Sequence, residues 1–88
     1  IEVVTIDEFF KDRSVSFIKM DIEGGEISAL HGAKRIIAQQ KPQLAICVYH
    51  RPEHLWQIPL TIHSFAPMMN IFLRHHAGSC VDTVCYAI

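Results

Sequence analysis

The stretch FIKMDIEGGE, residues 17–26, decides the predicted fold, because an apolar run ends there in acids and glycines. The run reaches Met20, and the carboxylates of Asp21 and Glu23 follow it directly. The adjacent glycine pair then breaks the segment. The pattern predicts a buried strand whose carboxyl end either leaves the core for solvent or delivers acids to a site.

The composition limits both the size and the partners of the protein. The chain has 88 residues, half of them hydrophobic, and this predicts one globular unit over residues 1–88. A net charge of −1, with scattered Lys and Arg, argues against nucleic acid or a membrane surface as partner. The uncharged stretch from Leu55 to His63 is too short for a membrane span.

The cysteines and the start of the chain bear on its location. Cys47, Cys80 and Cys85 are odd in number and lack CxxC spacing, which favours reduced thiols in a cytoplasmic protein. No secretory signal opens these 88 residues, and Ile1 lies inside an apolar run without a methionine. We therefore expect a cytoplasmic chain cut from a longer one.

Alternating apolar segments and breakers predict an α/β fold. Parallel strands joined by crossover helices should end in an antiparallel hairpin, because the loop around Gly78 is too short for a crossover. The strand over 15–22 is apolar almost throughout, which is typical of a strand covered on both faces. The expected elements are a strand or extended entry over 1–6, a polar or helical turn over 7–12, strands over 15–22, 43–49, 70–76 and 82–88, and helices over 26–40 and 51–67.

Both helices carry boundary signals. Glu26 lies in the first turn of the first helix, Lys34 and Arg35 lie toward its far end as the helix dipole favours, and Pro42 closes it. In the second helix we expect Pro59 to produce a kink or a late start.

Parallel topology would bring polar residues from separate segments to one rim, because ligands bind at the carboxyl ends of the strands in such sheets. The residues expected there are Asp21 and Glu23, Tyr49 and His50, Arg74, His75 and His76, and Asp82 and Thr83. His50 is the best placed general base, since imidazole titrates near neutral pH. Asp21 is the acid expected to orient the reactants.

Several of these residues can also be explained by structural roles alone. Glu26 can be a simple helix-start acid, and the glycine pair can serve a close ligand approach or an unusual turn. Tyr49 and Trp56 are expected to pack, and His31 and His63 to remain in helices. His50, His75 and His76 with Asp21 could ligate a metal, but adjacent strand residues point to opposite faces, so no metal site is predicted.

Four segments in order resemble FkbM-type methyltransferases: FIKMDIEGGEISALHGA, KPQLAICVYHRPEHLWQIP, LRHH and DTVCYA. The opening TIDEFF is similar to the segment before that family's acidic strand. The resemblance implies the carboxyl-terminal half of a Rossmann-like, S-adenosylmethionine-dependent O-methyltransferase. Its substrates would be hydroxyls of sugars, polyketides or similar small molecules.

The resemblance also implies roles for individual residues. Asp21 would lie close to the methyl donor and the acceptor, and Tyr49 and His50 would line the acceptor side. From their place on the rim, Glu23 is added to the predicted donor contacts and His75 to the predicted acceptor contacts, and the predicted catalytic residues are His50 and Asp21. The half that holds most of the donor, including a glycine-rich loop, is absent from these residues. The 88 residues alone are therefore expected to be inactive.

Two rival functions fit the same rim. One is a non-catalytic binding or assembly module, and the other is a metal-dependent hydrolase that uses Asp21 and His50. Self-association through the exposed edge of the strand over 15–22 is also expected, because an unpaired apolar edge attracts other chains.

Overall fold

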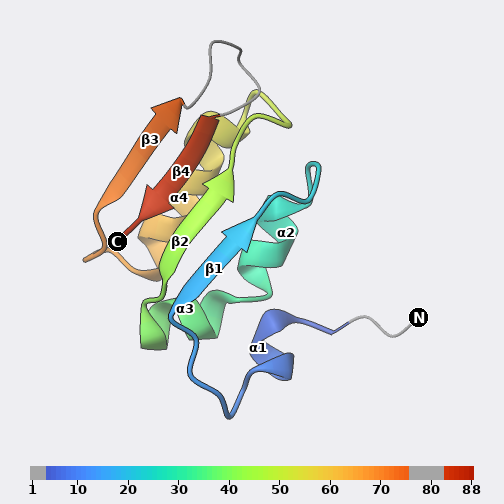
Figure 1. Cartoon of the computed structure of the whole chain (residues 1–88), viewed down its shortest axis with the longest axis vertical. Helices are drawn as coiled ribbons and strands as arrows, with labels where there is room; N and C mark the ends of the chain where they lie inside the picture. Colours follow the sequence, from blue (N-terminus) through green and yellow to red (C-terminus); the bar gives the residue numbers. More distant parts are fainter. Residues whose placement is uncertain (1–3, 76–82) are drawn as a thin grey trace.

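The computed structural model describes residues 4–75 and 83–88, and within them the strands form one four-stranded sheet (Figure 1). The strands are β1 (Phe17–Met20), β2 (Gln43–Cys47), β3 (Ile71–His75) and β4 (Thr83–Ala87), arranged in the order β1-β2-β4-β3. β1 and β2 are parallel, and β4 is antiparallel to both β2 and β3. The predicted α/β class and the antiparallel final strand are confirmed, with β4 inserted between β2 and β3.

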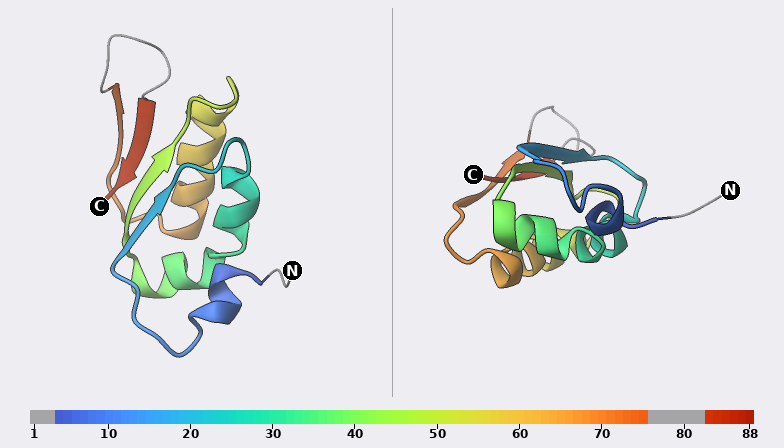
Figure 2. Two further views of the ribbon diagram at one scale, coloured as in Figure 1. Left: turned by 45° about the vertical axis from the view of Figure 1, so that its right-hand side comes forward. Right: turned by 90° about the horizontal axis from the view of Figure 1, so that it is seen from below.

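The helices lie on one side of this sheet (Figure 2). They are α1 (Ile6–Phe9), α2 (Glu26–His31), α3 (Lys34–Gln40) and α4 (His54–Phe65). The apolar core lies between this layer and one face of the sheet, where Leu30, Ile37 and Ile58 are fully buried. Burial of such side chains supplies about 1.5–3 kcal/mol each, which makes this layer the main source of stability.

No helix of the described residues covers the opposite face of the sheet. Burial alternates along β1, where Ile18 and Met20 face the core while Phe17 and Lys19 are exposed. The prediction that both faces of this strand are covered is therefore wrong for the described residues. An apolar strand with one open face leaves side chains such as Phe17, which is 55% exposed, without a packing partner from a helix.

The predicted single helix over 26–40 is two helices. α2 ends at His31, and α3 begins at Lys34 after a break at Gly32. Lys34 and Arg35 therefore occupy the first turn of α3, where the dipole disfavours positive charge, and not the far end of a long helix. The apolar spacing continues across the break, which is why the sequence pattern did not reveal it.

A distant carboxylate caps the start of α3. Ala33, its N-cap residue, makes no side-chain cap hydrogen bond. Instead, Asp7 accepts hydrogen bonds from the backbone N–H groups of Arg35 and Ile36, both at 2.9 Å. Asp7 belongs to α1, and this short helix confirms the predicted helical turn. Through Asp7, α1 caps the amino terminus of α3.

The second helix is shorter than predicted. α4 runs from His54 to Phe65, and Pro59 lies inside it, so Pro59 does not mark a late start. Ile58 and Ile62 anchor the helix in the core on either side of the proline.

The remaining strand predictions fall partly outside the described residues. For the segment predicted as a strand or extended entry over 1–6, Val4 and Thr5 are not in a strand, which agrees with the extended-entry alternative. Residues 1–3 of that segment lie outside the described residues. The predicted residues His76, Gly78, Cys80 and Asp82 also lie outside them.

Candidate functional site

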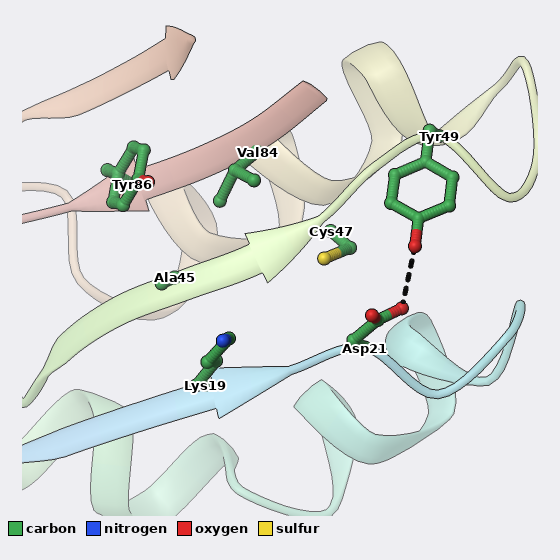
Figure 3. A pocket seen from close by; sticks show the side chains of 7 residues that line it. All are labelled: Lys19, Asp21, Ala45, Cys47, Tyr49, Val84 and Tyr86. Carbon is green, nitrogen blue, oxygen red and sulfur yellow. Dashed lines mark hydrogen bonds between the residues drawn. The ribbon is translucent and has the colours of Figure 1, made fainter. Parts of the chain in front are cut away.

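The first feature of the site is the meeting of β1 and β2 at their carboxyl ends. Parallel register pairs Met20 with Ile46, so Asp21 and Tyr49 follow neighbouring strands out of the sheet. The Tyr49 hydroxyl donates a hydrogen bond to Asp21 Oδ1 at 3.0 Å (Figure 3). His50 Nε2 lies 3.4 Å from the same oxygen, and the Tyr49 and His50 rings lie 4.2 Å apart between centroids. Three of the predicted rim residues are thus in direct contact.

A second carboxylate lies beneath this rim. Glu26, the first residue of α2, is fully buried. Its Oε2 accepts the Ile22 N–H at 2.9 Å and its Oε1 accepts the Gly24 N–H at 3.0 Å. Both bonds come from the turn after β1, so the carboxylate ties that turn to the start of α2.

The turn itself requires one glycine of the pair. Glu23 has φ 55° and Gly24 has φ 102°, both in the region that side chains disfavour. A Cβ at Gly24 would lie 3.2 Å from Nε of Arg51, whereas one at Gly25 would make only ordinary contacts with Ile22. The structure therefore favours the unusual-turn reading at Gly24.

Two histidines flank the buried carboxylate. His50 Nδ1 lies 3.3 Å from Glu26 Oε2, and His54 Nδ1 lies 3.8 Å from Glu26 Oε1. Both Nδ1 atoms are buried and have no hydrogen bond of good geometry within residues 4–75 and 83–88. His54 is only 2% exposed, so its ring belongs to the interior, while the His50 side chain is 17% exposed and reaches the rim.

An open pocket of about 370 Å³ extends from the rim across the uncovered face of the sheet (Figure 3). Its lining residues are Lys19, Asp21, Ala45, Cys47, Tyr49, Val84 and Tyr86. Burial, together with the nearby charges of Asp21 and Glu26, raises the pKa of the Cys47 thiol. The thiol therefore stays protonated at neutral pH, which argues against Cys47 as a nucleophile.

Two other predicted site residues lie apart from this cluster. Glu23 is exposed on the turn. His75 lies at the end of β3, where its Nδ1 is 2.9 Å from the Thr83 hydroxyl, and β4 separates β3 from β2.

Among the residues assigned to packing or helices, Trp56 is 56% exposed, so its predicted packing role is wrong. Tyr49 is half-buried, and His31 and His63 are in helices as expected.

Sequence reasoning missed two residues behind the rim. The sequence presents Glu26 as a helix-start acid, and it gives no sign that His54 is buried beside it. His50 lies four residues before His54 and outside α4, so helical spacing gave no signal for the pair. Their common carboxylate is 24 residues upstream of the first, and only the folded chain brings them together.

The cluster also has the residue types of a metal site. Asp21, Glu26 and His50 offer ligand atoms that all lie within 4.8 Å of one another. The imidazole, however, stands between the carboxylates, with Nε2 facing Asp21 and Nδ1 facing Glu26. One ion cannot use both ring nitrogens, so ligation by all three residues would require the ring or a carboxylate to move.

The mixed sheet, with a helix-covered face and acids at its strand ends, matches a fragment of a methyltransferase-like fold. The chain belongs to the FkbM methyltransferase family, because the family model "Methyltransferase FkbM domain" matches residues 1–79. The resemblance read from the sequence is thereby confirmed.

A solved structure, that of methyltransferase FkbM from Methylobacillus flagellatus KT, is similar to this chain at 47% identity and a TM-score of 0.87. The match covers 94% of this chain and 22% of that one, so this chain spans about a fifth of the similar protein. No curated protein matches the chain significantly. Among the described residues, no helix has the length and apolar character needed to cross a membrane.

Proposed function

We propose that the full-length protein is an S-adenosylmethionine-dependent O-methyltransferase that acts on a hydroxyl of a sugar, a polyketide or a similar small molecule. Family membership supports methyl transfer as the reaction class. The observation that carries the proposal is the contact of the partly exposed His50 imidazole with Asp21 at the carboxyl ends of two parallel strands. In α/β folds, ligands bind at this edge of the sheet, so a base and an acid there would lie beside the reactants.

The acidic rim suits the proposed methyl donor. When bound, S-adenosylmethionine supplies a methyl group whose bond to the sulfonium sulfur breaks as the acceptor oxygen bonds to carbon, the electron pair going to sulfur. The Asp21 side chain is 51% exposed, so its carboxylate is available to a cationic ligand. Asp21 and Glu23 are the donor contacts proposed from this chain, and the glycine-rich loop that would hold most of the donor is not in these residues.

His50 is proposed to accept the hydroxyl proton at Nε2, the ring nitrogen nearest the rim. Tyr49 holds Asp21 through its hydroxyl and, with His50 and His75, is proposed to line the acceptor side. Asp21 would orient the reactants. In this account the residues act mainly by positioning, which can lower a barrier by roughly 7–11 kcal/mol in favourable cases.

One observation favours a second candidate, metal-dependent hydrolysis. The ligand atoms of Asp21, Glu26 and His50 are close enough to bind an ion after a small rearrangement. A hydrolase of this kind would lose activity in a chelator and regain it with a divalent cation, whereas the methyltransferase proposal requires methylated product.

The direct experiment titrates the full-length protein with S-adenosylmethionine by calorimetry, then follows label transfer from methyl-labelled donor to a panel of hydroxyl compounds. Saturable donor binding and a labelled methyl ether are expected. Donor binding without product on any acceptor would favour a non-catalytic module. Absence of donor binding would overturn the proposal.

A further inference from the structure

The buried Glu26 carboxylate has matching surroundings on its two oxygens. Each oxygen accepts one backbone N–H, from Ile22 or Gly24, and each also faces one imidazole Nδ1, from His50 or His54. A fully buried carboxylate without compensating donors is strongly disfavoured. Within the described residues, His50 and His54 face it with buried Nδ1 atoms at 3.3 and 3.8 Å, and neither atom has another hydrogen-bond partner there.

The neutral His50 ring can carry its hydrogen on Nδ1 or on Nε2, and each nitrogen lies beside a different carboxylate. Its Nδ1 is buried against Glu26, and its Nε2 faces Asp21, which is half exposed and already accepts the Tyr49 hydroxyl. Hydrogen on Nδ1 would be donated to the Glu26 carboxylate, which water cannot reach. Hydrogen on Nε2 would be donated to the Asp21 carboxylate, which is already exposed to water. The lower dielectric around Glu26 strengthens the first interaction.

We propose that Glu26 is the positioning residue for His50: it holds the imidazole in the tautomer with hydrogen on Nδ1 and so leaves the Nε2 lone pair at the rim. This inference rests on the proposed role of His50 in methyl transfer. The carboxylate receives the Nδ1–H, and Nε2 is left to accept a proton from the substrate hydroxyl. After that transfer the ring is an imidazolium, and the negative charge of Glu26 stabilises it.

The structure explains why this role falls to Glu26 and not to Asp21. Glu26 is fixed by two backbone hydrogen bonds and complete burial, so it can hold the ring in one orientation. Asp21 is exposed at the rim and, being next to Nε2, stands where a bound acceptor would be. His54 contacts the other Glu26 oxygen with a ring that is almost entirely buried, which makes it a structural partner and a suitable control.

The first test reads the tautomer without any substrate. Long-range ¹H–¹⁵N correlation spectra of the full-length protein, recorded across a pH series, should show hydrogen on Nδ1 and none on Nε2 wherever the His50 ring is neutral. Hydrogen on Nε2 of the neutral ring would overturn the inference. Because no methyl donor or acceptor is present, this result does not depend on whether methyl transfer is the reaction.

The second test compares Glu26→Gln with His54→Leu. Glu26→Gln keeps the shape but removes the charge, so the Nδ1 tautomer should lose its dominance and kcat should fall roughly 10²-fold or more, with the acceptor KM little changed. His54→Leu should lower stability while preserving the His50 tautomer and kcat. Equal losses of kcat in both folded variants would show a merely structural effect and overturn the inference.

The two proposals fail in different ways. If His50→Ala abolishes methyl transfer while the spectra show hydrogen on Nε2, the proposed function stands and the role of Glu26 is wrong. If the spectra show the Nδ1 tautomer but the protein binds no methyl donor, the assignment of the reaction is wrong. Should Glu26→Gln not fold, the wild-type tautomer alone still decides the inference.

Discussion

His50 Nε2 lies 3.4 Å from Asp21 Oδ1, although 29 positions separate the two residues in the chain. The contact exists because β1 and β2 are parallel neighbours and each residue follows the carboxyl end of its strand. A crossover through α2 and α3 is what makes the strands parallel. The chemistry proposed for this protein therefore depends on a feature of topology and not on local sequence.

Gly24 and Gly25 should respond differently to the same substitution. Gly24→Ala should lower the free energy of unfolding by about 1–2 kcal/mol, because φ is 102° there and the new Cβ would approach Arg51. Gly25→Ala, the matched control, should change stability by about 0.5 kcal/mol or less, because its φ of −89° suits alanine. Urea denaturation measures both, and equal effects would contradict the assigned turn.

Asp7 should stabilise the protein through the start of α3. In Asp7→Ala, the backbone N–H groups of Arg35 and Ile36 lose their acceptor, which should lower the free energy of unfolding by about 1–2 kcal/mol. Asp12→Ala removes a similar charge from an exposed position and should have little effect. Thermal or urea unfolding measures the stability of both variants. Similar losses in the free energy of unfolding would argue against a capping role for Asp7.

Cys85 should make the protein less stable at alkaline pH. Burial raises the pKa of this thiol from 9.0 to about 12, so above pH 9 the unfolded chain loses a proton that the folded chain keeps. The free energy of unfolding should therefore fall with rising pH, by about 1.4 kcal/mol per unit between pH 9 and 12 from this group. Cys85→Ala should lack this part of the slope. An identical alkaline slope in the variant would contradict the burial of the thiol.

The order of strands and main helices could be predicted, because apolar runs and breakers are local signals. The break between α2 and α3 could not, since apolar spacing continues through it and the Asp7 cap comes from a distant segment. The open face of β1 was also missed, because apolar composition alone does not reveal whether a covering layer is present.

For the site, parallel topology was sufficient to bring Asp21, Tyr49 and His50 together. Glu26 was not assigned to the site because its burial follows from the turn at Gly24, a conformation that the glycine pair permits but does not specify. His75 ends β3, which runs in the same direction as β2, so the sequence placed it at the correct edge of the sheet. The insertion of β4, which separates it from β2, is a pairing choice that the order of elements leaves open.

The isolated 88-residue chain should self-associate. β1 is an edge strand of the described sheet, and Phe17 on its open face is 55% exposed. Sedimentation should show species larger than a monomer, and Phe17→Lys should shift the distribution toward monomer by adding charge to this strand. A wild-type chain that is monomeric and unfolds cooperatively would count against this expectation.

The most direct test of the central claim is the rate of methyl transfer by the full-length protein with His50→Ala. If His50 accepts the hydroxyl proton, turnover should fall roughly 10²–10⁴-fold with little change in affinity for S-adenosylmethionine. Asp21→Asn should also lower turnover, while His63→Ala, which changes an exposed histidine on α4, should leave it unaltered. A wild-type rate in a His50→Ala enzyme of unchanged stability would contradict the account.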